Sequence, residues 1–269
     1  MAEPRTCAVI PAAGRGTRLG SATPKIMVEV AGGVTVWDLL YRRLRPHVAH
    51  VHVVVSPDGE APFRELAAAR IAAGEVSVSV QHRPEGMGDA VFGAARFWAA
   101  YDAILVVWGD QANLSPETVG RVAAAHRSPG LTVPLVAMPD PYVEYELDRA
   151  GPAAGPDRSP GGTGDGETRL VRVRMSREGD PCRPGGLSDV GVFCLATAGL
   201  RAAWRLYLAG AAPGAVTGEV NFLPFLSYLS RVRDWPFRVV PVTDPQEARG
   251  INTPEDLEFA RQAFLRCPG

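Results

Sequence analysis

The alternation of short apolar runs with longer amphipathic stretches in the first half of the chain is the feature that most restricts its fold. Runs rich in β-branched residues are typical of buried strands, and the stretches between them have helical spacing. The strand-like runs are CAVI, HVHVVV, VSVSVQ and AILVVW, and the helix-like stretches are VTVWDLLYRRL, APFRELAAARIAA and GDAVFGAARFWAA. This order predicts a Rossmann-like, doubly wound α/β sheet whose strands are mainly parallel.

The pattern changes after Leu131, where strand-like segments follow one another with few helices between them. These segments are LTVPLVAM, YVEYELD, TRLVRVRMS and LSDVGVFCL. They predict a second, mixed or antiparallel layer that covers the first half. Residues 151–167 are rich in Gly and Pro and predict a mobile insertion, because this composition cannot bury much apolar surface. We therefore expect a single domain over 1–269 with two halves, 1–130 and 131–269.

Helices are predicted again near the C-terminal end, in LRAAWRLYLAG and NFLPFLSYLS, followed by a strand in PFRVVPV. The last helix is expected to begin after Thr253, a favourable N-cap residue, with Pro254 in the first helical position.

The charge balance excludes some classes of partner. With 28 basic and 29 acidic residues, the chain has no overall field that would attract nucleic acid or an anionic membrane. No segment reaches the roughly 20 apolar residues of a membrane span, and the N-terminal residues do not resemble a signal peptide, so we expect a cytoplasmic protein. The cysteines lack metal-site spacing and are expected to be buried free thiols; they are Cys7, Cys182, Cys194 and Cys267.

The loops that follow the strands are where a ligand is expected, because ligands of doubly wound sheets bind at the carboxyl ends of the strands. The informative loops should therefore follow Ile10, Val80 and Trp108. The first loop reads VIPAAGRGTRLGSATPK. Its glycines let successive backbone N–H groups face an anion, and its arginines and lysine add positive charge. The loop predicts a polyphosphate site, although a glycine pair alone would also suit a tight surface turn.

The sequence G-x-G-T-R followed by P-K, directly after the first strand, resembles the signature loop of the sugar-1-phosphate nucleotidyltransferases. The resemblance is closest to the uridylyltransferase domain of N-acetylglucosamine-1-phosphate uridylyltransferase. It implies a GT-A-like nucleotidyltransferase fold, with a nucleotide-binding half, an acceptor-binding half and a smaller antiparallel acceptor-binding layer. It also implies catalytic roles for Arg15, Arg18 and Lys25. The nucleotide-binding residues it implies in this loop are Ala12, Ala13, Gly14, Gly16 and Thr17.

The stretch QHRPEGMGDA resembles the base-recognition loop of that family and implies nucleotide contacts by Gln81, Gly86 and Gly88. Met87 stands where the uridylyltransferases commonly carry threonine, and it is included among the nucleotide-binding residues. The opening IPAAG also resembles the cytidylyltransferases of isoprenoid biosynthesis, so UTP and CTP both remain open. Gln81 alone would equally suit a polar residue at the end of an edge strand.

The metal candidates come from two further stretches. ILVVWGDQ resembles the family's strand that ends in a metal-binding aspartate, and ARGINTPEDL resembles the segment with the second ligand. Asp110 and Asn252 are therefore implied to hold Mg2+, whose preferred ligands are oxygens. Asp110 could instead cap a helix, and Asn252 taken alone suits a turn or a cap.

The acceptor candidates are Glu178 in MSREGD, Asp189 in SDVGVF and Glu219 in TGEVNFLPF. Asp189 replaces the asparagine of the family's Asn-Thr-Gly, and a carboxylate at this position would prefer a hydroxyl or an amine donor. This difference leaves the acceptor open between a sugar phosphate and a similar phosphate or phosphonate.

The resemblance implies Mg2+-dependent transfer of a nucleoside monophosphate from a nucleoside triphosphate to a small phosphorylated acceptor, with release of pyrophosphate. The enzyme would act as a monomer or homodimer and would need no histidine base. We accordingly expect His47, His50 and His52 at surface or edge positions, while His82 lies beside the nucleotide loop. Two alternatives are a GT-A-type glycosyltransferase, which would be expected to carry Asp-x-Asp, and a non-catalytic nucleotide-binding module.

Overall fold

The structure is a computed structural model that describes residues 4–14, 19–20, 23–83, 85–149 and 168–266. The strands of this part of the chain are β1 (Thr6–Ala12), β2 (Glu29–Ala31), β3 (Val34–Thr35), β4 (His50–Val55), β5 (Val76–Val80), β6 (Ala103–Val107), β7 (Leu131–Ala137), β8 (Val143–Arg149), β9 (Thr168–Met175), β10 (Leu187–Asp189), β11 (Val192–Ala196) and β12 (Phe237–Pro241).

The helices of the described residues fall into α-helices and short 3-10 helices. The α-helices are α1 (Val36–Leu44), α2 (Pro57–Leu66), α3 (Ala68–Ala72), α4 (Met87–Gly93), α5 (Ala95–Trp98), α6 (Pro116–Ala125), α7 (Leu200–Leu208), α8 (Leu223–Val232) and α9 (Pro254–Arg266). The 3-10 helices are η2 (Lys25–Met27), η3 (Arg45–His47), η4 (Ser176–Glu178) and η5 (Pro245–Ala248).

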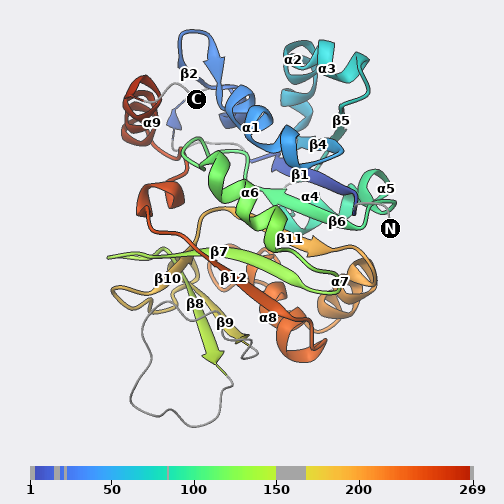
Figure 1. The fold of residues 1–269 in the computed structure, drawn as a ribbon, viewed down its shortest axis with the longest axis vertical. Coiled ribbons are helices and arrows are strands. Elements are labelled where there is room, and N and C mark those ends of the chain that lie inside the picture. Colours follow the sequence, from blue (N-terminus) through green and yellow to red (C-terminus); the bar gives the residue numbers. More distant parts are fainter. Residues whose placement is uncertain (1–3, 15–18, 21–22, 84, 150–167, 267–269) are drawn as a thin grey trace.

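A central sheet of eight strands runs through the described part of the molecule in the order β10-β7-β11-β6-β1-β4-β5, with β12 paired to β7 (Figure 1). The pairs β1–β4, β1–β6, β4–β5 and β7–β12 are parallel, whereas β11 is antiparallel to both β6 and β7. The predicted α/β class with a large, mostly parallel sheet is confirmed.

The second half of the chain extends this sheet instead of covering it, so the prediction of a second layer is wrong for β7, β10 and β11. The reason lies in β6, which is buried along its whole length and needs hydrogen-bond partners on both edges. β1 supplies the partner on one edge and β11 the partner on the other. The strand predicted in PFRVVPV, β12, joins the same sheet beside β7. The strands β8 and β9 do form a separate antiparallel pair.

Two hydrophobic clusters lie on opposite faces of the sheet, as the alternation of side chains along a strand requires. In β1, Ala8 and Ile10 belong to one cluster, and Cys7 and Val9 belong to the other. The first cluster includes residues of α1, α2, α6 and α9, and the second includes residues of α4, α5, α7 and α8. Helices therefore cover both faces, which is the doubly wound arrangement.

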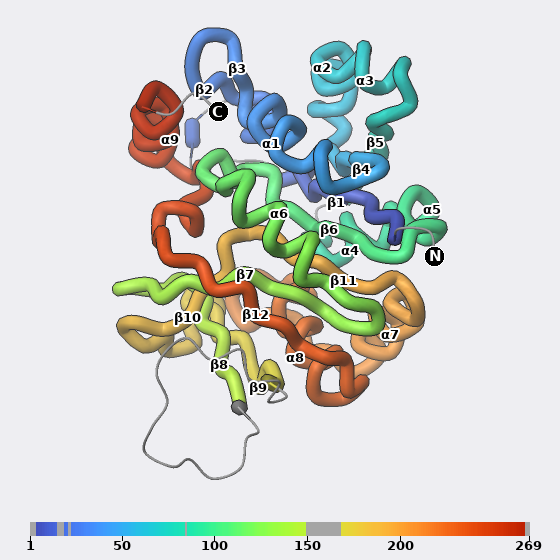
Figure 2. Tube along the Cα trace, in the orientation of Figure 1, coloured from blue at the N-terminus to red at the C-terminus, as the bar shows by residue number. Residues whose placement is uncertain are grey.

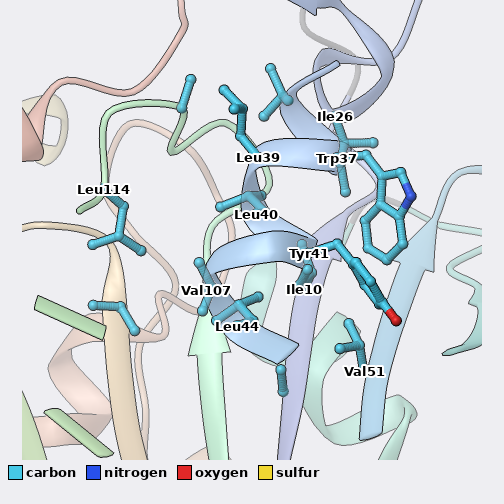
Figure 3. Packing of buried hydrophobic residues seen from close by; sticks show 14 of the residues in the cluster. Ile10, Ile26, Trp37, Leu39, Leu40, Tyr41, Leu44, Val51, Val107 and Leu114 are labelled. Carbon is cyan, nitrogen blue, oxygen red and sulfur yellow. The ribbon is translucent and has the colours of Figure 1, made fainter. Parts of the chain in front are cut away.

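Helix α1 shows how a single helix seals the first face. A capping box fixes its start, since Asp38 N donates to Thr35 Oγ1 at 3.2 Å and Thr35 N donates to Asp38 Oδ2 at 3.1 Å. Figure 3 shows Leu40 and Leu44 pointing from α1 toward the strands that carry Ile10 and Val107. The burial of these side chains holds α1 on the sheet, because apolar area removed from water stabilises by about 25 cal/mol per Å2.

Helix α9 brings the C-terminal part of the chain beside its N-terminal part. Figure 2 shows α9 next to the β2–β3 hairpin, and Arg261 Nε donates to the carbonyl of Val30 at 3.1 Å. The predicted start of α9 is confirmed: Asp256 N donates to Thr253 Oγ1 at 3.2 Å, and Pro254 is the first helical residue. The segment before α9 thus lies on the same side of the molecule as η2, which directly precedes β2.

The predictions about His52 and the cysteines can now be compared with the structure. His52 lies in β4, between β1 and β5, and is fully buried, so its expected surface or edge position is wrong. Cys7 and Cys194 are buried free thiols as predicted, and burial raises the pKa of each to about 12. Cys182 is free and half-buried, while Cys267 lies outside the described residues. No helix among the described residues is long and apolar enough to cross a membrane.

His52 is buried as a neutral ring in a polar niche. Its Nδ1 lies 2.7 Å from Ser77 Oγ, its Nε2 lies 2.9 Å from Ser79 Oγ, and its ring stacks on Phe97. Burial lowers the pKa of His52 to about 3, with smaller contributions from His50 and Arg96. In the unfolded chain His52 therefore takes up a proton near pH 6.5, whereas in the folded chain it stays neutral until the pH falls to about 3.

We predict that stability falls as the pH drops through this window. Between pH 7 and pH 5, His52 should remove about 2 kcal/mol from the free energy of unfolding. The variant His52→Gln should be less stable at pH 7 but should lose less on acidification, because glutamine does not titrate. Urea unfolding of both proteins at the two pH values measures the difference, and parallel losses in the two proteins would contradict the assignment.

Candidate functional site

A cleft of about 980 Å3 opens at the carboxyl ends of the parallel strands. Its lining includes residues 12–14 at the end of β1, residues 81 and 86 after β5, and residues 108–110 after β6. The sequence placed ligand contacts in these same loops. The topology explains why they meet, since the parallel strands β1, β5 and β6 all end at one edge of the sheet.

Lys25, Asp110 and Asn252 meet in this cleft, although they are far apart in the sequence. Lys25 Nζ donates to Asp110 Oδ2 at 3.1 Å and to Asn252 Oδ1 at 2.7 Å. The side chains of Lys25 and Asp110 are each 19% exposed, so the ion pair is partly shielded from water. Lys25 is also the only lysine in the sequence, a signal that we did not use.

Local structure fixes Asp110 and Asn252 in this position. Asp110 follows the buried strand β6, and its carbonyl accepts a hydrogen bond from Ile251 N at 2.8 Å. Asn252 N donates to Asp256 Oδ2 at 3.0 Å, so the first turn of α9 holds its backbone. Asp110 does not cap either of the helices near it, because Ser115 caps α6 and Thr253 caps α9.

The oxygens of Asp110 and Asn252 are a donor set that suits Mg2+. This ion binds through one or two carboxylates and completes its coordination with waters and substrate phosphates, so two protein oxygens are enough. The described residues hold no group of three or more His, Cys, Asp or Glu side chains that could bind a metal ion. The ammonium of Lys25 between the two oxygens shows that this position favours positive charge.

The side chain of Gln81 links the two ends of the predicted nucleotide loop by hydrogen bonds. Its Nε2 donates to the Gly86 carbonyl at 3.0 Å and to Asp89 Oδ2 at 2.7 Å. Gln81, Gly86 and Met87 line the cleft, as do Ala12, Ala13 and Gly14. The remaining predicted residues of the first loop lie outside the described residues; they are Arg15, Gly16, Thr17 and Arg18.

Gly88 does not line the cleft and has a packing role. A Cβ at this position would lie 2.3 Å from the ring of Trp204, so α4 approaches α7 more closely than any other residue would permit. The glycine is buried, and its site faces the second hydrophobic cluster. The two glycines of the Gly-x-Gly pattern therefore differ in role: Gly86 lines the cleft, and Gly88 lets α4 pack against Trp204.

The acceptor candidates also differ in whether they line the cleft. Asp189 and Glu219 line the cleft, whereas Glu178 does not. The Glu178 carboxylate accepts hydrogen bonds from Thr217 Oγ1 at 2.6 Å and from Val216 N at 2.9 Å. These bonds, the one from Thr217 Oγ1 foremost, lower the pKa of Glu178 to about 2. Glu178 thus anchors the segment that carries Glu219.

Sequence reasoning missed several polar residues that line the cleft, namely Trp108, Gln111, Arg177 and Asn221. Trp108 and Gln111 flank Gly109 and Asp110 in the same short stretch, and their proximity to Asp110 was the available signal. Arg177 and Asn221 bond to each other from distant parts of the chain, a contact that no local pattern announces.

Comparison with known proteins gives matches over most of the chain. Residues 8–146 match the model of the MobA-like NTP transferase domain. Bifunctional protein GlmU of Anaeromyxobacter sp. is 29% identical over 260 residues, which are 96% of this chain and 49% of the relative. GlmU of Pseudomonas putida is 34% identical over 135 residues, covering 49% of this chain and 28% of the relative. The chain therefore spans about half the length of the first of these relatives and a smaller share of the second.

A solved structure shares the fold. It is described as a proposed glucose-1-phosphate thymidylyltransferase from Bacillus anthracis in complex with sucrose. It superposes with a TM-score of 0.69 and 14% identity, and the match covers 96% of this chain and 94% of the other.

We predict that Gly88→Ala destabilises the fold, because the added methyl group overlaps the Trp204 ring. Overpacking of this kind typically costs about 1–3 kcal/mol. Gly93→Ala, at the end of the same helix, is the matched control, since a Cβ there meets nothing within 4 Å. Thermal unfolding of both variants measures the effect, and equal melting temperatures would refute the packing role.

Proposed function

The chain belongs to the MobA-like NTP transferase family, and on this premise we propose that it transfers a nucleotidyl group from UTP or CTP to a small phosphorylated acceptor. The acceptor would be a sugar phosphate, or a similar phosphate or phosphonate, and pyrophosphate would be released. The expected family is confirmed by the match to the MobA-like NTP transferase domain, and this match supports the proposed nucleotidyltransferase activity. Family members generally use a divalent metal ion, and we propose Mg2+ here.

The observation that carries this proposal is the convergence of Lys25, Asp110 and Asn252 in one cleft. Nucleotidyl transfer brings together two anions that repel each other, so the site must gather positive charge and hydrogen-bond donors around phosphate oxygens. We propose that residues 1–130 bind the nucleotide and that residues 131–269 bind the acceptor. Gln81 would then position the Gly86 backbone at the base, because its Nε2 is already bonded within the loop.

The proposed reaction is an in-line displacement. An oxygen of the acceptor phosphate attacks the α-phosphorus, the bond from that phosphorus to the β-phosphate bridging oxygen breaks, and pyrophosphate leaves. The acceptor oxygen is already ionised at neutral pH, so no general base is required. Arg15, Arg18 and the backbone N–H groups of the first loop would neutralise the triphosphate. Mg2+ held by Asp110 and Asn252 would stabilise charge on the non-bridging oxygens.

Lys25 has the central role among the described residues. Its ammonium has three donors, and two of them are directed at Asp110 and Asn252. The third can reach a phosphate oxygen while the other two hold the side chain in place. Lys25 would thereby orient the phosphate and offset the charge that builds up as pyrophosphate departs.

Lys25→Ala should lower kcat by about 10^2- to 10^3-fold, the loss typical of removing one donor to a developing oxyanion. Lys25→Arg should recover only part of the rate, since a planar guanidinium cannot occupy the position of a compact ammonium. Arg42→Ala, which removes an exposed cation from α1, is the control. Pyrophosphate release from UTP and CTP with a panel of acceptor phosphates measures the rates, and near-normal turnover of Lys25→Ala would contradict this role.

Asp110→Asn should weaken Mg2+ binding by about 10- to 100-fold, because the site loses its anionic ligand. The half-saturating Mg2+ concentration for pyrophosphate release should rise accordingly, and calorimetric titration of Mg2+ in the presence of nucleotide should show the same shift. Glu65→Gln, an exposed acid on α2, serves as the control. An unchanged metal titration would exclude Asp110 as a ligand.

A further inference from the structure

One wall of the cleft contains buried polar atoms that have no hydrogen-bond partner among the described residues. They are Trp108 Nε1, Gln111 Oε1 and Asp189 Oδ2, and all three residues line the cleft. Gln111 is 1% exposed and Asp189 is 4% exposed. Buried polar groups are nearly always paired, so an unpaired set on the wall of a cleft indicates a missing ligand.

The backbone holds this wall rigidly. The first oxygen of Asp189 accepts a hydrogen bond from Gly191 N at 2.8 Å, and the Gly191 carbonyl accepts one from Trp108 N at 2.9 Å. Gly191 has φ 76°, and a Cβ there would lie 2.5 Å from Gln111 Nε2, so only glycine permits this close approach. The positions of Gln111 and Asp189 are therefore fixed before any ligand arrives.

The charge of Asp189 is not balanced by the other described residues of the cleft. Each cation that lines the cleft is paired with a different carboxylate: Lys25 with Asp110 at 3.1 Å, Arg249 with Asp256 at 2.8 Å, and Arg177 with Glu178 at 3.8 Å. Burial raises the pKa of Asp189 to about 6, and the Gly191 amide and the Tyr145 hydroxyl offset part of this rise. An ionised carboxylate in such a place is strongly unfavourable unless a ligand compensates its charge.

The surroundings of Asp189 favour a cationic ligand over a neutral one. The residues of this wall that line the cleft offer two acceptors, Asp189 Oδ2 and Gln111 Oε1, against one donor, Trp108 Nε1. The Tyr145 hydroxyl is a further donor next to Asp189, but it does not line the cleft and carries no charge. A group with several N–H donors satisfies the acceptors and neutralises the carboxylate, whereas a hydroxyl group gives one hydrogen bond and no charge. Aromatic residues also line the cleft, and a cation bound near their rings gains further stabilisation.

We propose that this wall, formed by Trp108, Gln111 and Asp189, binds an ammonium group of the acceptor. Resting on the proposed function, this assigns the acceptor to the phosphates or phosphonates that also carry a positively charged amine. The ammonium would anchor one end of the acceptor at Asp189, and its phosphate would extend toward Lys25. A neutral sugar phosphate would leave the carboxylate buried and uncompensated.

Matched pairs of acceptors test this assignment. The pairs are 2-aminoethyl phosphate with 2-hydroxyethyl phosphate, and glucosamine 1-phosphate with glucose 1-phosphate, each differing by one amine or hydroxyl group. We expect kcat/KM at pH 7 to favour the amine of the accepted pair by about tenfold or more, as for a charge-assisted bond in a desolvated site. The ratio within a pair is insensitive to how much of the enzyme is folded.

Asp189→Asn should bring this ratio close to one or reverse it, since asparagine keeps an oxygen for the Gly191 amide and removes the charge. Asp58→Asn, which removes an exposed carboxylate from α2 outside the cleft, is the control, and its ratio should match the wild type. A wild-type preference for the hydroxyl acceptors, or a ratio unchanged in Asp189→Asn, would overturn the proposal.

Failure of the proposed function would look different. If no acceptor released pyrophosphate with any nucleoside triphosphate, calorimetric binding of the same four compounds to wild type and Asp189→Asn would still decide the matter. Tighter binding of an amine that is lost in Asp189→Asn supports the ammonium site. Equal binding of amine and hydroxyl acceptors to wild type refutes it.

Discussion

The contact of Lys25 with Asp110 and Asn252 is the interaction on which the cleft depends. It joins the segment after β1 to the end of β6 and to the segment before α9, which are themselves linked by the bond from Ile251 N to the Asp110 carbonyl. The ammonium and the carboxylate are each 19% exposed and have lost most of their hydration. Their proximity offsets that loss, and the same loss of water strengthens the attraction that either group can exert on a substrate. The charge that organises the site is thus also the charge that a phosphate would use.

The alternation of strands and helices in the first half could be predicted from the sequence because at least one α-helix separates each of β1, β4, β5 and β6 from the next strand of the central sheet. The second half could not be placed, since an apolar run shows that a strand is buried but does not show which edge it joins. LSDVGVFCL reads as one strand, yet the chain turns at Gly191 and divides it into β10 and β11. The glycine within the run was the local signal. The contact of Gly191 with Gln111, which gives the turn its purpose, lies far away in the sequence.

The residues of the site, like the strands, could be predicted only where local sequence and topology decide their position. The position of residues in the loops at the strand ends could be predicted, because topology alone brings those loops together: Ala12, Gln81 and Asp110 all line the cleft. Gly88 and Glu178 have their partners in Trp204 and Thr217, on elements whose position depends on the whole fold. Asp189 stood out in the sequence as a carboxylate in place of an amide. That no cation pairs with it in the described part of the chain depends on the charges from several segments around the cleft, and no pattern within one segment contains this information.

The choice of lysine at position 25 is explained by the geometry of the two oxygens that face it. The chain has 28 basic residues, and Lys25 is its only lysine, so a residue type avoided everywhere else is kept at this one point. A guanidinium is planar and matches two oxygens of a single carboxylate. Here the oxygens belong to different side chains, at 3.1 and 2.7 Å from one nitrogen, and a tetrahedral ammonium can contact both and still direct its third N–H elsewhere. Arginine elsewhere supplies charge and forked hydrogen bonds, whereas this position requires a compact charge with donors in three directions. That requirement follows from joining two walls of a cleft while leaving room for a phosphate between them.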